Sequence, residues 1–137
     1  MSRATHVVRL YVGLNRQTQP RNARCARQPT SYTAARVDDV FDAIRRRQGV
    51  QKPGATRFVA KGLWKGRREK TSVYEVQWFP GGSETYAQFR KNMNAVARGI
   101  AARFCQDAVL VVHRTPRQKV SLFVSPRTRR SARQVKP

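Results

Sequence analysis

Apolar and polar residues alternate strictly near the start of the chain. Every second position is apolar over the first such stretch, at Val8, Leu10, Val12 and Leu14. A period of two predicts a β-strand with one buried face. From Asn15 to Thr33 no period is present, and Arg, Gln, Asn, Pro and Thr dominate. This stretch predicts a loop or a mobile arm.

Two later stretches carry apolar residues at helical spacing. In the first, acids come early and arginines come late, which complements the helix dipole, and Gly49 is a natural stop. Its apolar positions are Val37, Val40, Phe41 and Ile44. The second helix is expected to begin at Ser83 as N-cap. Its apolar positions fall at steps of three or four, at Tyr86, Phe89, Met93, Val96, Ile100 and Phe104.

Between these helices the sequence predicts a β-hairpin. The two strands run from Thr56 to Lys65 and from Thr71 to Phe79, joined at 66–69. We expect Phe58 and Trp64 to face the helices, with Trp78 on the matching apolar face of the second strand. Ala108 to Val112 predicts a further strand, and Val120 to Val124 is a candidate for a short fifth.

The order of these elements is strand, helix, strand, strand, helix, strand. This order predicts an α+β fold, a ferredoxin-like βαββαβ sandwich. Two helices would cover one face of a four-stranded antiparallel sheet and leave the other face open. A hydrophobic content of 39% suffices for one core. We therefore expect a single domain over 1–114, with an Arg-rich loop at 15–33, and a basic flexible extension over 115–137.

Three stretches resemble a group of small bacterial and phage proteins of unknown function. They are Tyr11 to Asn15 (YVGLN), Gly54 to Arg67 (GATRFVAKGLWKGR) and Arg103 to Val111 (RFCQDAVLV). Proteins of this group similarly pair a YVGL strand, a G-W-K-G hairpin and an RFGQEAVLV-like passage from helix to strand. Cys105 stands where they tend to have Gly. The resemblance implies the βαββαβ fold and no particular activity.

Charge changes the picture of the surface. The chain has 29 Lys and Arg against 7 Asp and Glu, a formal net charge of +22. Residues 1–36 and 115–137 contain no acid, and the middle of the chain is also basic. Because a basic fold with basic flanks repels itself, its charge indicates a polyanionic partner.

Cysteine usage and hydropathy bear on the compartment. Cys25 and Cys105 are too few for a disulfide scaffold and lack metal-ligand spacing, so we expect two small thiols, buried or incidental, in a reducing compartment. No apolar run is long enough to cross a bilayer. These features favour a cytoplasmic protein.

Few residues suit catalysis. Asp38 and Asp39 are adjacent on a helix and point in different directions, so helix-dipole stabilisation explains them better than paired acid and base roles. His6 begins the first strand and His113 ends the last, so the two histidines are expected to lie close together in the sheet. No third ligand follows from the sequence. We expect no catalytic residue, cofactor or metal site.

Basic residues interleaved with aromatic ones give the stronger signal. On the open face, Arg57, Lys61 and Lys65 are expected beside Arg9 and Tyr11, offering phosphate partners and a ring for base stacking. The alternative is a solvated sheet face whose lysines prevent aggregation. The full predicted nucleic-acid-binding set is Arg9, Tyr11, Arg45, Arg46, Arg47, Arg57, Lys61, Lys65, Arg67, Arg68, Arg127, Arg129, Arg130 and Arg133.

Together these features favour a non-catalytic nucleic-acid-binding protein. Its partner would be RNA or single-stranded DNA, within a larger ribonucleoprotein or phage assembly. Arginine outnumbers lysine in both flanks, which favours phosphate forks and base stacking. One alternative is a phage-encoded inhibitor or adaptor that docks on an acidic protein surface, with no membrane partner. An enzymatic alternative is a metal-dependent nuclease that relies on His113.

Overall fold

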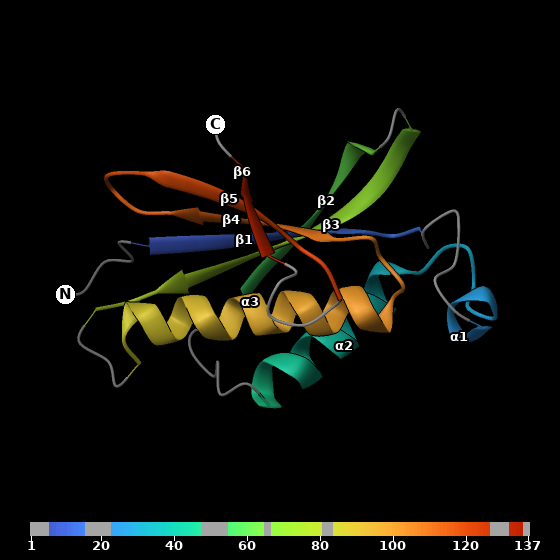
Figure 1. Ribbon diagram of the computed structural model, residues 1–137, viewed down its shortest axis with the longest axis horizontal. Helices are drawn as coiled ribbons and strands as arrows, with labels where there is room; N and C mark the ends of the chain where they lie inside the picture. The colour runs from blue at the N-terminus through green and yellow to red at the C-terminus, as the bar shows by residue number, and fades with distance from the viewer. Residues whose placement is uncertain are drawn as a thin grey trace.

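The computed structural model describes residues 6–15, 23–47, 55–64, 67–80, 84–126 and 132–135. In chain order the elements are β1 (His6–Gly13), α1 (Ala23–Ala26), α2 (Ala34–Arg47), β2 (Ala55–Trp64), β3 (Arg67–Trp78), α3 (Tyr86–Arg103), β4 (Val109–Arg114), β5 (Lys119–Val124) and β6 (Ala132–Val135). The described strands form one antiparallel sheet in the order β2-β3-β1-β4-β5-β6. Helices α2 and α3 lie on one face of it (Figure 1). The expected α+β class is confirmed.

Strand β1 is the centre of the sheet because its alternation buries one face completely. Val8, Leu10 and Val12 are fully buried, as their period of two predicts. Leu10 lies opposite Tyr74 on β3 and Val111 on β4, so three neighbouring strands present apolar residues to the helices. The expected antiparallel pairing of the first strand with the strand that carries His113 is confirmed.

The C-terminal strands extend the sheet beyond four. The candidate fifth strand is confirmed as β5, which pairs with β4 from Val109↔Val124 to Arg114↔Lys119. Strand β6 was not predicted, since 126–137 has no apolar period. It pairs with β5 from Ser121↔Val135 to Val124↔Ala132. Backbone pairing to an available edge, rather than burial of side chains, accounts for this strand.

Helix α3 is the main cover of the sheet. Its N-cap is Thr85, whose hydroxyl accepts from Gln88 N at 3.1 Å, while the Gln88 side chain accepts from Thr85 N at 2.9 Å. This reciprocal pair is a capping box. Ser83, the expected N-cap, lies outside the described residues. The predicted apolar stripe is buried as expected, with Phe89, Met93 and Ile100 fully enclosed.

The two long helices meet at a close contact. A Cβ placed on Gly99 of α3 would lie 3.1 Å from Ile44 Cδ1 of α2, so a larger residue there would require the Ile44 side chain to shift slightly. Phe41 of α2 in turn stacks on Tyr74 of β3, with ring centroids 4.2 Å apart. These contacts join both helices and the sheet in one core.

The two faces of β2 are the reverse of those expected. Arg57 lies on the helix side, where its guanidinium donates to Asp38 of α2 at 2.9 and 3.1 Å. Phe58 lies on the open face, is 40% exposed, and has Arg9 5.7 Å above its ring. The prediction that Phe58 faces the helices is therefore wrong. On this edge strand it is Arg57 that faces the helix, where it forms an ion pair with Asp38, while the apolar Phe58 side chain lies on the other face.

The segment after β1 also differs from expectation. It contains the short helix α1, and Cys25 of that helix forms a disulfide with Cys105, 80 residues away. The prediction of two incidental thiols is therefore wrong. Sequence spacing gave no sign of the pairing, because only the packed fold brings α1 to the end of α3. In the part of the chain that the structure describes, no helix is long and apolar enough to cross a bilayer.

Candidate functional site

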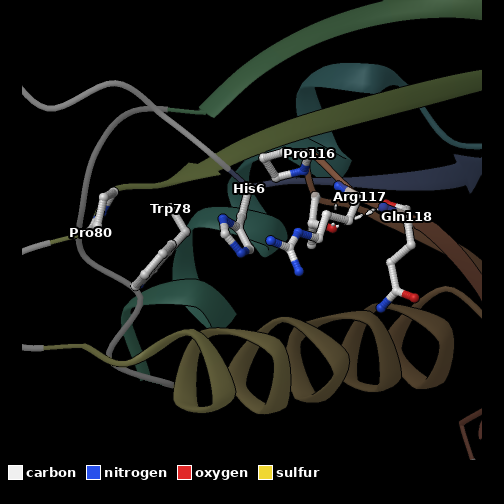
Figure 2. A pocket seen from close by; sticks show the side chains of 7 residues that line it. His6, Trp78, Pro80, Pro116, Arg117 and Gln118 are labelled. Carbon is white, nitrogen blue, oxygen red and sulfur yellow. Dashed lines mark hydrogen bonds between the residues drawn. The ribbon is translucent and has the colours of Figure 1, made fainter.

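A hollow of about 640 Å³ opens at one end of the sheet. It lies where β1 begins, β3 ends and β4 turns into β5, and the first turns of α3 run along one side (Figure 2). Its size falls within the range of small-molecule sites, roughly 300–1,000 Å³. The lining residues are His6, Trp78, Pro80, Thr115, Pro116, Arg117 and Gln118.

Aromatic rings form one wall of this hollow. His6 lies opposite Trp78 in the β1–β3 register, and the two ring centroids are 4.9 Å apart in an edge-to-face arrangement. Tyr86, the first residue of α3, brings its ring centroid to 4.2 Å from that of His6. The indole is fixed because Trp78 Nε1 donates to Glu84 O at 2.8 Å. The wall is therefore a rigid, largely apolar surface suited to a flat ring or a cation.

The opposite wall is the turn between β4 and β5, and it is polar. Thr115 N donates to Gln118 O at 2.8 Å, and Gln118 N donates back to the Thr115 hydroxyl at 3.1 Å. These bonds fix the backbone of the turn, so the exposed side chains of Arg117 and Gln118 project from a rigid base. In Figure 2 the Arg117 side chain points into the hollow, towards the His6 ring. The turn thus places a guanidinium and an amide opposite the aromatic wall.

His113 lies on the helix side of β4, between this turn and the core. It is buried, and its Nε2 lies 3.2 Å from Asn94 Oδ1 of α3. Burial, with a smaller contribution from the Arg90 guanidinium, lowers the His113 pKa to about 4. The ring is therefore neutral near pH 7. Arg90 also lies 5.8 Å above the Tyr86 ring, so a second cation flanks the aromatic wall.

The two histidines lie on neighbouring antiparallel strands, as expected, with His6 at the start of β1 and His113 one residue before the end of β4. His113 lies opposite Val8, two residues after His6. Their contacts differ, because His6 packs on Trp78 and Tyr86, whereas His113 meets Asn94. Within the described residues, no group of three or more His, Cys, Asp or Glu could hold a metal ion.

The basic residues expected to bind nucleic acid are distributed over several parts of the surface. On the open face, Arg9 pairs with Glu75 at 2.8 Å beside Tyr11, whereas Arg57 pairs with Asp38 on the helix side. Arg45 pairs with Asp42 at the end of α2, where Arg46 and Arg47 are exposed. Lys61 is exposed on β2. The structure does not bring these groups onto one face.

The other predicted positions are described less fully. Arg67 and Arg68 belong to β3 and Arg133 to β6, but their side chains lie outside the described part of the structure. Lys65, Arg127, Arg129 and Arg130 lie outside the described residues altogether, as does the side chain of Trp64.

Sequence reasoning missed the hollow itself. Trp78 was expected only as part of an apolar strand face, and Arg117 only as one charge of a basic tail. The available signal was local: a Trp-Phe-Pro strand end and a Thr-Pro-Arg-Gln turn. Nothing in the sequence shows that these two segments meet, because β1 lies between them in the sheet.

Comparison with known proteins gives a fold and no family. No protein-family model and no curated protein match the chain. A phage SAM lyase solved in complex with S-methyl-5'-thioadenosine is similar in structure, with a TM-score of 0.64 and 21% identity. That match covers 88% of this chain and 91% of the other. A phage SAM lyase in the apo state gives 0.60 and 20%, over 87% and 89%.

At this level of identity the likeness shows a shared fold. Both solved proteins are enzymes, and this finding contradicts the sequence-based prediction of a non-catalytic nucleic-acid-binding protein or of a non-enzymatic adaptor. The prediction that the chain is not an enzyme is contradicted by the same finding. Both are also phage proteins, which agrees with the resemblance to small bacterial and phage proteins. Over nearly its whole length, this chain has the fold of the phage SAM lyases.

Proposed function

We propose that this protein cleaves S-adenosylmethionine and releases S-methyl-5'-thioadenosine. The observation that carries the proposal is the likeness to the phage SAM lyases, which extends over 88% of this chain and 91% of the other. The hollow at the end of the sheet adds support, because its two walls suit the groups of this substrate.

The substrate has three parts that need recognition, and the hollow offers a partner for each. The adenine ring fits the aromatic wall of His6 and Trp78, with the Gln118 amide available to its polar edge. The sulfonium is a cation that favours the face of an aromatic ring. The carboxylate of the methionine part matches the Arg117 guanidinium, which can bind it with two hydrogen bonds.

Release of S-methyl-5'-thioadenosine requires cleavage of the bond between the sulfonium sulfur and Cγ of the methionine part. The sulfur keeps the bonding electron pair and becomes a neutral thioether. In the route we favour, a carboxylate oxygen of the same substrate forms the new bond to Cγ, which closes a lactone. No proton is gained or lost in this step, so it requires no catalytic base.

The surroundings of the hollow favour this step electrostatically. A negative carboxylate and a positive sulfonium disappear together, so the transition state carries less separated charge than the substrate. Such a reaction is faster where water is excluded and the local dielectric constant is low. The rings of His6 and Trp78 and the two prolines Pro80 and Pro116 give the hollow apolar surface from which a bound substrate would displace water. Arg117 would orient the carboxylate.

The direct test is incubation of the purified protein with S-adenosylmethionine, followed by chromatography and mass spectrometry. We expect S-methyl-5'-thioadenosine and a lactone in equal amounts. Trp78→Leu should abolish this turnover, whereas Phe58→Leu, which changes an exposed ring on the open face, should leave it intact. Absence of product from the folded wild-type protein would refute the proposed activity. Loss of activity in both variants would argue against the hollow as its site.

The finer fold class is also a proposal. We assign the core to the ferredoxin-like class because β2, β3, β1 and β4 lie in that order and two helices cover one face. The expected RNA, single-stranded DNA or acidic protein partner stays a prediction, as does division into a domain over 1–114 and an extension over 115–137.

A further inference from the structure

Helix α1, between β1 and α2, has little means of holding its own structure within the described residues. Its helix α1 has four residues, too few to be stable alone. Cys25 is the one buried residue of that helix, and Arg24 and Arg27 beside it are exposed. Helix α1 therefore contributes almost no apolar surface to the core. The disulfide to Cys105 joins it covalently to the molecule.

The attachment point is the C-terminal end of α3. Cys105 has φ of 52°, a left-handed conformation that residues with a side chain seldom adopt. Arg24 supports the link, since its guanidinium donates to Ala102 O at 2.6 Å. The same guanidinium lies 3.7 Å from Cys105 Sγ and 3.9 Å from Cys25 Sγ. The disulfide and the Arg24 guanidinium thus both attach helix α1 to the end of α3.

The described residues on either side of α1 are held without the disulfide. The Tyr32 ring packs edge-to-face on Phe104 at 4.8 Å, and Tyr32 N donates to Leu14 O at 2.7 Å. Gln106 Nε2 donates to Asn15 O at 2.6 Å. These contacts flank α1 on both sides and remain when the sulfur bond is absent. Loss of the disulfide should therefore free α1 and leave the sandwich folded.

We propose that the Cys25–Cys105 disulfide is a redox-dependent tether, so that thiol–disulfide exchange switches α1 between a docked and a released state. A thiolate of a dithiol reductant attacks one sulfur of the bond and forms a mixed disulfide, and the other cysteine leaves as a thiolate. The second thiol of the reductant then displaces the remaining cysteine. Two electrons and two protons pass to the protein, and the reductant becomes a disulfide.

Arg24 favours this exchange electrostatically. A guanidinium near a sulfur stabilises the thiolate form, and a stabilised thiolate is the better leaving group. The Arg24 guanidinium lies near both sulfurs, so it can stabilise whichever cysteine leaves as the thiolate. Both cysteines are fully buried, so the reductant gains access only when α1 opens transiently.

The released state exposes a protease-sensitive segment, and this provides the test. Arg24 lies in α1 and Arg27 directly follows it, so both are trypsin sites in the part of the chain that the tether attaches to α3. We expect trypsin to cut after these residues about tenfold faster or more in dithiothreitol than in the oxidised protein, because cleavage follows the open population. Mass spectrometry identifies the cut, and circular dichroism should show the sandwich still folded.

Two variants serve as controls. Cys25→Ser cannot form the bond, so its cleavage should be fast and insensitive to dithiothreitol. Cys25→Ser with Cys105→Gly should behave the same way, and glycine adopts the left-handed conformation at position 105 without strain. Equal cleavage of oxidised and reduced wild type would overturn the proposal. So would loss of cooperative melting in the double variant, since the disulfide would then support the whole fold.

Helix α1 lies near the C-terminal end of α3 (Figure 1), whereas His6 of the hollow packs on Tyr86, the first residue of α3. An 18-residue helix is about 27 Å long. Cleavage of S-adenosylmethionine, if present, should therefore proceed at the same rate in the oxidised and reduced protein. The proposed activity and the proposed tether can accordingly fail independently of each other.

Discussion

His113 Nε2 lies 3.2 Å from Asn94 Oδ1, while Nδ1 of the same ring has no hydrogen-bond partner within the described residues. Nε2 of the neutral ring can donate to the amide oxygen, and Nδ1 then carries only a lone pair. Protonation would place a charge on Nδ1 in a buried site, with Arg90 as the nearby cation. This arrangement explains why burial lowers the pKa of His113 to about 4.

Stability should fall on acidification through this histidine. In the unfolded chain the imidazole takes up a proton below its ordinary pKa of 6.5, and in the fold only near 4. Between these values the unfolded state binds more protons, so the free energy of unfolding decreases as pH falls. The full effect is about 3 kcal/mol at roughly 1.4 kcal/mol per pKa unit.

The measurement is urea denaturation across this pH range for wild type and His113→Gln. We expect the variant to be less stable than wild type at pH 7. This difference in the free energy of unfolding should shrink as pH approaches 4, because only wild type loses the contribution of His113. The contributions of carboxylates, which both proteins share, cancel in the difference. A difference that stays constant with pH would mean that His113 is not the responsible group.

Asp38 should matter more for stability than its neighbour Asp39. Asp38 accepts from the Tyr74 hydroxyl at 2.5 Å and from both Arg57 donors. The Arg57 pair is partly exposed and worth little. Burial and the hydrogen bond to Asp38 raise the pKa of Tyr74, so its hydroxyl stays protonated. This buried hydroxyl therefore needs a hydrogen-bond acceptor.

We therefore expect Asp38→Asn to cost about 1–3 kcal/mol in the free energy of unfolding. Asp39→Asn, an exposed position one residue further along α2, should change it by less than about 0.5 kcal/mol. Both are measured by chemical denaturation at neutral pH. Equal effects in the two variants would show that Tyr74 finds another partner.

The elements with strong periods could be predicted from the sequence. β1, α2 and α3 bury most of their apolar residues, so their patterns are set by the core. The orientation of the two faces of β2 could not be predicted from the sequence. On this edge strand Arg57 and Phe58 lie on opposite faces, and only the position of Asp38 in the fold determines which of them is turned towards the helices. The Cys25–Cys105 bond and the hollow between Trp78 and Arg117 depend on contacts between distant segments.

Arg117 should distinguish the substrate from its product. S-adenosylmethionine carries a carboxylate, whereas S-methyl-5'-thioadenosine has none. If Arg117 binds the carboxylate, Arg117→Gln should raise KM about tenfold or more, since a charge-assisted pair is worth roughly 1.5–3 kcal/mol. The affinity of the Arg117→Gln variant for S-methyl-5'-thioadenosine, measured by calorimetry, should be the same as that of wild type.

Arg114→Gln is the matched control for this experiment. Arg114 is exposed, and it lies opposite Val7 on the face of the sheet that the helices do not cover. The control should leave both KM and product affinity as in wild type. Equal weakening of substrate and product in Arg117→Gln would mean that the guanidinium acts on the adenosine part.

Salt should affect this protein in the direction opposite to that of a nucleic-acid binder. S-adenosylmethionine has a net charge of +1 near pH 7, from a sulfonium, an ammonium and a carboxylate. A protein with a formal net charge of +22 repels it at long range. Raising ionic strength shortens the screening length to about 10 Å at 0.1 M, so kcat/KM should rise modestly from low to moderate salt. Binding of the uncharged S-methyl-5'-thioadenosine should barely change. A kcat/KM that falls steeply with salt would contradict this prediction. It would show that attraction between the substrate carboxylate and the basic surface outweighs the repulsion by the overall charge.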